Sequence, residues 1–448
     1  MSRLLRREYG VVVRRTFVVM GHILCRNNYQ WSGRKEQPFL RRKSCRATIP
    51  MWGKFRSSRP PRIALYSHDA LGMGHMRRNS LIAQALAAPP LNAIVLLISG
   101  AKELSAMKLA PGVDCLTVPS LSKDSAGGYQ PRNLAISRAM LMEMRARTIA
   151  AAVDVFDPHM LIVDKLPRGV FRELDPTLER MRSRGRVCVL GLRDVLDDPV
   201  TVRREWSEAE SDRAVADYYH AAFVYGDPTV YDLLAEYGMS QEMTTRVRFT
   251  GYLDPSVRAL GEPDHAAAST LASIAPDNEV VFCEVGGGQD GEALANAFTE
   301  AELPRGFTAV LVTGPFMPAP ARDRLAATAR KKPNLRVLEF TSEPTHILRR
   351  SSRVIAMGGY NTVCEVLCLG KPALIVPRTT PRTEQLIRAE RLRDLGLLDV
   401  MDPENLSPLS LSQWIAADTT PPPDIRDRID FNGLSRIPHL AHDLLAVA

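Results

Sequence analysis

The chain is poor in the features that mark secreted, membrane-spanning and metal-binding proteins. Its seven cysteines are odd in number and scattered, and no two of them form a Cys-x-x-Cys pair. Neither a disulfide framework nor a Cys/His metal cluster is therefore expected, and free thiols of the reducing cytoplasm are the simplest interpretation. The apolar runs near the start are split by Arg14 and Arg15, so no uninterrupted stretch of membrane-spanning length occurs there. No small-residue cleavage site follows them, which argues against a secretory signal.

Acidic residues are scarce in the first 60 positions, where fifteen Lys and Arg stand beside only Glu8 and Glu36. This extension carries +13, whereas the rest of the chain carries −5 of the total formal charge of +8. A mildly acidic folded body argues against a nucleic-acid partner. We expect residues 1–60 to be disordered, and three interpretations stay open. They are an Arg-rich targeting presequence, a basic arm that contacts anionic lipids at the inner face of a membrane, or a later start of translation at Met51.

Predicted strands alternate with predicted helices along almost all of the remaining chain, as is typical of parallel, doubly wound sheets. A length of 448 residues is large for one core. A second run of strand–helix units begins at Glu279. We therefore predict an α/β chain with two Rossmann-like domains, an N-terminal one at 61–255 and a C-terminal one at 256–448, which face a cleft where ligands bind. A loop is expected over 119–131 and a long helix over 132–156.

The most informative motif lies near the end of the chain, where two glycines join a predicted strand to a predicted helix. The apolar run Val354–Met357 ends at Gly358 and Gly359, and the helix begins at once. Free amides at such a helix start attract phosphate. Glu365 follows one turn later, where an acid commonly accepts hydrogen bonds from ribose hydroxyls. The unit is typical of a nucleotide site.

A second glycine turn occurs earlier in the chain, after the β-branched run Glu279–Val285. Gly286–Gly291 follows it, and a predicted helix comes next. Three consecutive glycines let a backbone approach a ligand closely. Either turn alone could serve only to reverse the chain. Two such turns, the later one followed by an acid, favour a nucleotide-binding function.

A histidine stands at the start of the first predicted helix. His75 follows Gly72 and Gly74, directly after the first predicted strand. A helix dipole disfavours the imidazolium ion, so a neutral His75 could act as a general base at pH 7. The plainer alternative is a histidine that only makes a hydrogen bond there. Arg193 and Asp194, at the end of another predicted strand, are expected to face the same cleft unless they form a buried ion pair.

Together these motifs resemble the GT-B glycosyltransferases, specifically glycosyltransferase family 28, which includes the murein-precursor N-acetylglucosaminyltransferases. The resemblance covers roughly residues 62–400. More closely, the chain looks like a bacterial branch of predicted glycosyltransferases, of which Arg193-Asp194 and Tyr225–Pro228 are typical. Tyr360, Asn361 and Glu384 differ from the murein enzyme, which leaves the donor sugar open.

The resemblance also implies which residues bind the substrates. The backbone at Phe340 and Thr341 would hold uracil, and Glu384 with Gln385 would hold sugar hydroxyls. His75 would be the catalytic base. The donor-binding residues would be Gly286, Gly287, Gly288, Gln289, Asp290, Phe340, Thr341, Gly358, Gly359, Asn361, Thr362, Glu365, Glu384 and Gln385. The acceptor-side residues would be Gly72, Gly74, Arg193 and Asp194.

The implied activity is transfer of a hexosyl group from a nucleoside-diphosphate sugar, UDP-linked, to a small-molecule, lipid-linked or polysaccharide acceptor. The implied location is cytoplasmic, with peripheral membrane contact. No metal or other cofactor is expected, because GT-B enzymes stabilise the departing diphosphate with amides and helix dipoles. The sequence also contains no Asp-x-Asp tripeptide of the kind that carries a metal in other glycosyltransferases.

Two other functions fit the same fold. A non-hydrolysing nucleotide-sugar 2-epimerase would need a cluster of catalytic acids in the N-terminal half, and no such cluster is evident in the sequence. A non-catalytic donor-binding subunit is the second alternative. The histidine turn in the N-terminal half argues against it.

Overall fold

The computed structural model describes residues 59–69, 74–102, 104, 107–123, 128–260, 262–418 and 425–447. Nearly all of the predicted basic extension, 1–60, lies outside the described residues, and so does Gly72. The body of the chain, from residue 59 onward, has two halves, each built on one parallel sheet.

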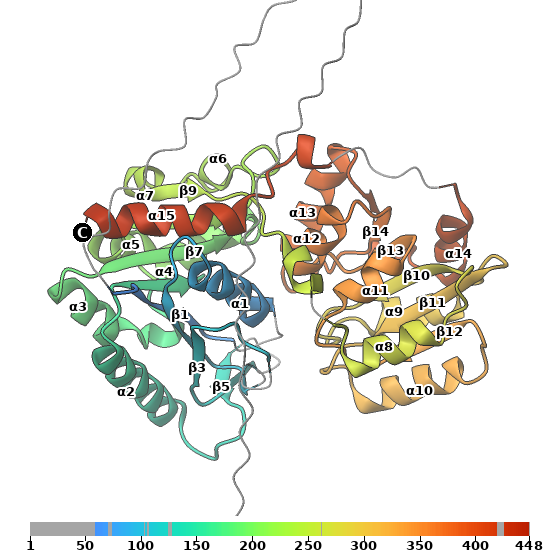
Figure 1. Cartoon of the computed structure of the whole chain (residues 1–448), viewed down its shortest axis with the longest axis horizontal. Coiled ribbons are helices and arrows are strands. Elements are labelled where there is room, and N and C mark those ends of the chain that lie inside the picture. Colours follow the sequence, from blue (N-terminus) through green and yellow to red (C-terminus); the bar gives the residue numbers. More distant parts are fainter. Residues whose placement is uncertain are drawn as a thin grey trace, which may run out of the picture. The chain divides into compact units, whose positions relative to one another are not determined.

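The first half of this body is built on a parallel sheet of seven strands (Figure 1). Its spatial order is β3-β2-β1-β6-β7-β8-β9. The central strands β1, β6, β7 and β8 are almost fully buried because helices cover both faces of the sheet, whereas β3 and β9 at the two edges are more exposed. The bounds are β1 Arg62–Ser67, β2 Ile94–Ser99, β3 Val113–Thr117, β6 Met160–Asp164, β7 Val187–Arg193, β8 Ala221–Tyr225 and β9 Val247–Phe249.

The second half has a parallel sheet of six strands, in the order β12-β11-β10-β13-β14-β15. Counted along its own half of the chain, this is the 3-2-1-4-5-6 order of doubly wound dinucleotide-binding folds. The predicted fold class, with two Rossmann-like sheets, is confirmed. The bounds are β10 Glu279–Glu284, β11 Phe307–Val312, β12 Leu335–Leu338, β13 Arg353–Ala356, β14 Ala373–Ile375 and β15 Asp399–Val400.

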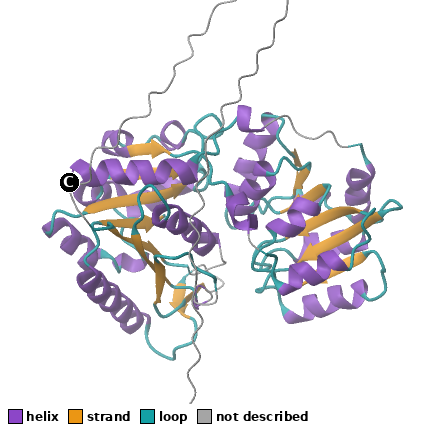
Figure 2. Cartoon of the chain, viewed as in Figure 1, coloured by secondary structure: helices purple, strands orange, loops and turns teal. Residues whose placement is uncertain are grey.

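Helices connect the parallel strands and lie on both faces of each sheet (Figure 2). Those of the first half are α1 Gly74–Ala87, α2 Arg138–Phe156, α3 Asp175–Ser183, α4 Pro199–Glu208, α5 Ser211–Tyr218, α6 Leu233–Tyr237 and α7 Gln241–Arg246. Those of the second half are α8 His265–Ala272, α9 Glu292–Glu300, α10 Ala319–Ala329, α11 Thr345–Arg350, α12 Tyr360–Cys368, α13 Glu384–Asp394, α14 Pro408–Ala416 and α15 Gly433–Val447. Short 3₁₀ turns occur at Val170–Arg172, Pro255–Leu260, Pro403–Asn405 and Ile425–Asp427.

The last helix of the chain returns to the first sheet. α15 packs against α1 (Figure 1) and buries Ile437 and Ala441 completely. The C-terminal segment therefore contributes apolar surface to the half that begins the chain. The residue bounds of the two predicted domains stay a prediction.

The structure differs from the sequence-based expectation in the segment before α2. The expected loop over 119–131 contains a short antiparallel hairpin, β4 Leu121–Lys123 with β5 Tyr129–Pro131, which Leu121 anchors by complete burial. The expected helix over 132–156 begins only at Arg138, because the Ser137 hydroxyl caps it by accepting a hydrogen bond from the Met140 amide.

The order of strands reverses at one place in each sheet. In the first sheet β1 and β6 flank the reversal, and in the second β10 and β13 flank it. Open parallel sheets bind ligands outside the carboxyl ends of such strand pairs. β6 ends at Asp164 and β10 ends at Glu284. His75 follows β1, and the glycine pair at 358–359 follows β13. The topology therefore places the candidate residues where ligands of this fold class bind.

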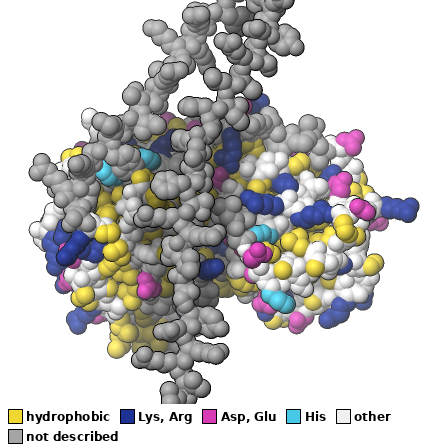
Figure 3. All heavy atoms as spheres, in the orientation of Figure 1, with side chains coloured by type: hydrophobic (Ala, Val, Ile, Leu, Met, Phe, Trp, Pro, Cys, Tyr) yellow, Lys and Arg dark blue, Asp and Glu magenta, His cyan; other side chains and the backbone are white. Residues whose placement is uncertain are grey.

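Within the described ranges no helix is long and apolar enough to cross a membrane. Lys, Arg, Asp and Glu side chains are interspersed with hydrophobic ones on the face seen in Figure 3.

Candidate active site

In the first sheet the reversal joins a histidine, an aspartate and an arginine. His75 is the second residue of α1, and its Nδ1 lies 2.5 Å from Oδ2 of Asp164, the last residue of β6. Arg78, one turn further along α1, donates from Nη2 to both oxygens of Asp164 at 2.6 and 2.8 Å. Arg78 and Asp164 are each only 2% exposed, so this ion pair is shielded from water.

The surroundings set the charge of these groups. Burial lowers the pKa of His75, and although Asp164 opposes this effect, the pKa stays below its usual value. Burial would raise the pKa of Asp164, but Arg78 and His75 outweigh it and hold that pKa well below the usual range. At pH 7 the pair is therefore an aspartate and a neutral imidazole. Because Nδ1–H then donates to the carboxylate, Nε2 is the nitrogen that can accept a proton. The pKa of His75 is thus low, as the sequence predicted, but its leading cause is burial rather than the helix dipole.

The second sheet brings its glycine turn and a buried glutamate together. Gly358 has φ +83°, and a Cβ there would lie 2.7 Å from a methyl carbon of Ile375, so the turn needs glycine. Gly359 then caps α12 without a side chain, which leaves the first amides of the helix open to a ligand. The Thr362 hydroxyl donates to Oε1 of Glu284 at 3.2 Å. Oε2 of Glu284 is buried without a hydrogen-bond partner.

The ionisation of Glu284 is predicted to make stability depend on pH. Burial raises the pKa of this carboxyl, while Arg77 and the Thr362 hydroxyl oppose the effect. The unfolded chain therefore ionises Glu284 at lower pH than the folded chain does, and the folded state loses stability as pH rises through that interval. Gln does not ionise and can still accept from Thr362. Glu284→Gln should become more stable than the wild type as pH rises from about 4 to about 8.

Urea unfolding of both proteins at several pH values measures this difference. Glu300→Gln, at an exposed position at the end of α9, is the matched control and should show no trend with pH. A stability difference that stays constant over the whole range would remove Glu284 as its source.

The two predicted half-sites touch each other at the starts of α1 and α12. Asn361, the second residue of α12, donates from Nδ2 to the Gly74 carbonyl at 2.9 Å. Arg77 of α1 donates to the Thr341 carbonyl at 3.2 Å, in the segment expected to hold the base. The candidate base and the candidate phosphate turn are therefore neighbours.

Arg378 connects three of the predicted donor-binding residues. Its guanidinium pairs with Asp290 at 2.9 Å and with Glu384 at 2.7 Å, and its backbone amide donates to Oε1 of Gln385 at 3.0 Å. The segment Gly286–Gly291 and the start of α13 thus meet through one arginine. Arg378 is not part of any motif that the sequence shows.

The structure resolves the alternatives left open for the Arg193-Asp194 pair. Asp194 forms a buried ion pair, but its partner is Arg388 of α13, at 2.7 Å with both side chains 0% exposed. The Tyr252 hydroxyl donates to the same carboxylate at 2.9 Å. Asp194 therefore holds the first sheet against α13 and offers no surface to an acceptor. Arg193 is not part of this pair.

The remaining predicted residues differ in accessibility. Glu365 is 1% exposed on α12 and Thr341 is 2% exposed, whereas Phe340 is 39% exposed. Gly286, Gln289 and Asp290 are exposed in the turn after β10. Arg145 of α2 is fully buried and pairs with Glu173 at 2.6 Å.

Asp164, Arg78 and Glu284 were missed by the sequence analysis. Asp164 is the last residue of β6 and Glu284 the last of β10. A polar residue at the carboxyl end of a parallel strand is the signal that could have identified them. Arg78 had no such signal, because its role depends on which strand lies beside α1.

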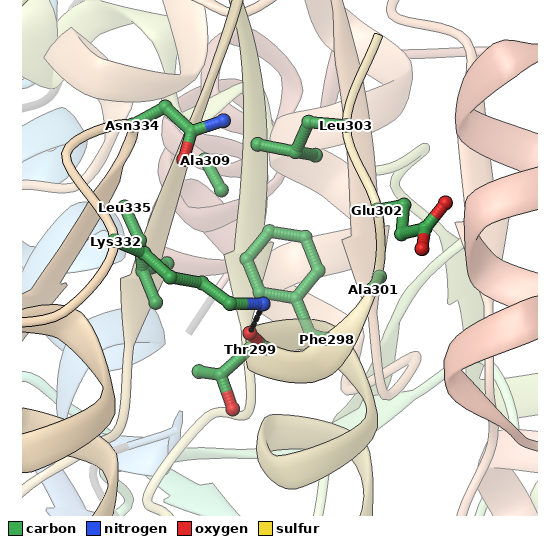
Figure 4. A pocket seen from close by; sticks show the side chains of 9 residues that line it. All are labelled: Phe298, Thr299, Ala301, Glu302, Leu303, Ala309, Lys332, Asn334 and Leu335. Atoms are coloured by element: carbon green, nitrogen blue, oxygen red, sulfur yellow. Dashed lines mark hydrogen bonds between the residues drawn. The ribbon is translucent and has the colours of Figure 1, made fainter.

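A hollow elsewhere in the second half does not belong to this site. Its lining includes Phe298, Lys332 and Leu335 (Figure 4), and Lys332 donates to the Thr299 carbonyl at 2.7 Å. It lies near the amino ends of β11 and β12, opposite the strand ends where ligands of this fold class bind. In the described part of the chain, no group of three or more His, Cys, Asp and Glu could hold a metal ion.

Gly286, Gly288 and Gly291 have the Gly-x-Gly-x-x-Gly spacing of dinucleotide sites, directly after β10. Such sites carry an acid at the end of the next strand, which binds the ribose. Here β11 ends at Val312 and continues into Thr313 and Gly314. The local sequence therefore lacks the acid that a dinucleotide needs.

A model of a known protein family matches most of the C-terminal half. The model of the glycosyltransferase family 28 C-terminal domain matches residues 283–443. The UDP-N-acetylglucosamine–N-acetylmuramyl-(pentapeptide) pyrophosphoryl-undecaprenol N-acetylglucosamine transferase of Clostridium tetani is 28% identical over 136 residues, which are 29% of this chain and 36% of that protein. The protein of the same name from Paenarthrobacter aurescens is 27% identical over 199 residues, 43% of this chain and 51% of that protein. The chain thus spans between about a third and a half of these relatives.

Solved structures share the fold over most of the chain. MurG of Acinetobacter baumannii has a TM-score of 0.53 at 14% identity, covering 86% of this chain and 100% of that one. A UDP-glucose: anthocyanidin 3-O-glucosyltransferase in complex with UDP has a TM-score of 0.54 at 13% identity, covering 88% and 100%. UDP-GlcNAc 2-epimerase from Neisseria meningitidis, bound to UDP-GlcNAc, has a TM-score of 0.53 at 13% identity, covering 86% and 99%. At these identities the likeness shows the fold alone, which is GT-B.

Proposed function

We propose that this chain, which carries a glycosyltransferase family 28 C-terminal domain and resembles that family, transfers a hexosyl group from a UDP-linked sugar to an acceptor hydroxyl. The observation that carries the proposal is the contact between Asn361 and Gly74. It brings the start of α12, where a diphosphate would bind, beside the start of α1, which holds His75. A donor and a base are needed at one place for sugar transfer.

In the proposed reaction Nε2 of His75 takes the proton of the acceptor hydroxyl. Asp164 holds the imidazole in the required tautomer through Nδ1 and stabilises the imidazolium that forms, as a buried aspartate does in catalytic triads. The amides at the start of α12 stabilise the negative charge of the departing diphosphate. Glu365 would bind the ribose, and Glu384 with Gln385 the sugar hydroxyls. No metal or cofactor takes part in the proposed reaction.

The acceptor is proposed to be lipid-linked or polysaccharide-linked. The family 28 domain and the relatives, whose names include an undecaprenol-linked acceptor, support this assignment. The protein would then work in the cytoplasm, in peripheral contact with the membrane that holds such an acceptor.

Nucleotide binding without metal tests the proposal most directly. Isothermal titration of the full chain with UDP, GDP, TDP and ADP in the presence of EDTA should give micromolar binding of one diphosphate, UDP. Micromolar affinity corresponds to about −8 kcal/mol, which amides, a helix dipole and base contacts can together supply. Binding of none of the four would remove the transferase proposal and favour a different function on the same fold.

A nucleotide-sugar 2-epimerase is the second candidate, because the structure places acids near the histidine. Besides Asp164, Asp69 is only 3% exposed, accepts hydrogen bonds from Ser67 and Ser99, and is influenced by the charge of His75. The full chain would be incubated with UDP-N-acetylglucosamine without acceptor and followed by proton NMR. Appearance of the 2-epimer would establish this function, whereas an unchanged donor would exclude it for this sugar.

A further inference from the structure

Arg193 belongs to the candidate site, and its side chain forms no ion pair with any residue that the structure describes. Arg78 pairs with Asp164, Arg388 with Asp194, and Arg378 with Asp290 and Glu384. Among the described residues no ion pair of Arg193 is found, and its Nε is buried without a hydrogen-bond partner. A buried donor without an acceptor costs about 1–3 kcal/mol, and most such groups in folded proteins have a partner. The guanidinium is therefore available to an acceptor that the chain does not supply.

The groups around Arg193 define where that acceptor would lie. Arg193 ends β7, and burial lowers its pKa, as do the charges of Arg388 and Arg78, whereas Glu384 has the opposite effect. β7 runs beside β6 with Gly191 opposite Asp164, so the end of β7 lies near the His75 cluster. The ion pair of the next residue, Asp194, with Arg388 holds this strand end against α13, which begins at Glu384. Glu384 belongs to the pair that the resemblance implies for the sugar hydroxyls.

Glu384 also has a carboxylate oxygen without a hydrogen-bond partner. Its Oε1 accepts from Arg378, but Oε2 is buried without a hydrogen-bond partner. The charge of Glu384 acts on Arg193, yet the two side chains form no direct ion pair. A donor at the end of β7 and an acceptor at the start of α13, two elements that the Asp194–Arg388 pair holds together, are thus both without a hydrogen-bond partner. A ligand that fits must accept from Arg193 and donate to Glu384.

An acidic sugar has both properties, because its carboxylate accepts from a guanidinium and its ring hydroxyls donate to a carboxylate. We propose that Arg193 binds an anionic group of a substrate, which lies beside Glu384 in the candidate site. The inference rests on the proposed function. The anion is either the carboxylate of a uronic-acid donor or a phosphate of the acceptor, and the geometry favours the donor because Glu384 belongs to the predicted sugar pair.

Titration of the full chain with UDP, UDP-glucose and UDP-glucuronate tests the first source. The wild type should bind UDP-glucuronate about 10–100-fold more tightly than UDP-glucose, as expected for a charge-assisted hydrogen bond. Arg193→Gln should lose this preference and keep its affinity for UDP, whereas Arg193→Lys should retain part of it. Arg213→Gln, at a position 76% exposed on α5, is the control and should behave as the wild type does.

The second source is tested on protein saturated with UDP, which is titrated with inorganic phosphate and with glucose 1-phosphate, and with glucose as the neutral comparison. Binding of the phosphates that Arg193→Gln weakens about tenfold or more would assign the anion to the acceptor. The proposal is overturned if Arg193→Gln weakens neither UDP-glucuronate nor the phosphates, or weakens UDP-glucose equally. Failure of the wild type to bind UDP would instead defeat the proposed function itself. An unfolding curve of Arg193→Gln that matches the wild type shows that the variant is folded.

Discussion

His75→Ala is expected to lower turnover by about 10²–10⁴-fold while donor affinity stays close to that of the wild type, because a positioned general base contributes about this much. The imidazole of His75 contacts Asp164 and Arg78. Among the described residues it makes no hydrogen bond to the glycine turn at 358–359, where the donor would bind. Turnover of the sugar donor and titration with UDP separate the two effects. A fall in turnover of less than tenfold would leave His75 with a structural role only.

The pH profile distinguishes a base from a merely structural histidine. Turnover should fall on the acid side as His75 is protonated, with a midpoint below the usual pKa of histidine because burial lowers its pKa. Asp164 raises the pKa of His75, so Asp164→Asn should move that midpoint to lower pH and also reduce turnover by disturbing the tautomer. His265→Ala, at an exposed position at the start of α8, is the control and should leave both unchanged.

Asp194→Ala is expected to destabilise the protein by about 3–5 kcal/mol, because it leaves the buried charge of Arg388 without its partner. Both side chains are 0% exposed, and Arg388 donates to Asp194 from Nε and Nη2. Urea unfolding followed by circular dichroism measures the loss. The control is Glu143→Ala, which breaks an exposed pair with Arg147 on α2, with side chains 61% and 81% exposed, and should cost less than about 1 kcal/mol.

A second variant separates charge burial from loss of packing. In Asp194→Leu combined with Arg388→Met no buried charge is left alone, and such replacements are often close to neutral. The double variant should therefore recover most of the stability lost in Asp194→Ala. Equal destabilisation in both would mean that shape, and not charge, makes this contact important.

The fold was largely predictable because its signals are local. Apolar runs of strand length, glycine turns and helical patterns indicated the strands of both sheets except the short edge strand β15, and the structure has strands at those places. Where the structure differs from the predicted elements, the difference also has a physical cause. The 119–131 segment is rich in turn residues, yet the burial of Leu121 holds a hairpin there, and α2 begins late because Ser137 caps it. Neither Leu121 burial nor the cap could be read from composition.

The site was predictable in part. His75, Gly358 and Gly359 stand out because a helix start needs a turn, and a turn of this kind needs glycine. Their partners do not stand out. Asp164 and Arg78 are ordinary charged residues in the sequence, and their importance arises only because the strand order places β6 beside β1.

Asp194 illustrates the same limit. Its neighbour Arg193 was the natural candidate for an ion pair, since the two are adjacent in sequence. Successive residues at the end of a strand point to opposite faces, so Asp194 instead meets Arg388, 194 positions further along the chain. Sequence reasoning could therefore not predict that Asp194 pairs with Arg388 and not with Arg193.

The sequence by itself determined the elements, their α/β class and the two glycine turns, because these depend on neighbours within a few residues. The tertiary structure alone decided which charges are paired. It brought Asp164 to His75, Arg388 to Asp194 and Arg378 to Glu384, and among the described residues it left Nε of Arg193 buried without a hydrogen-bond partner. A charge pair forms wherever two elements meet in space, and that meeting depends on strand order and helix packing rather than on any local run of residues.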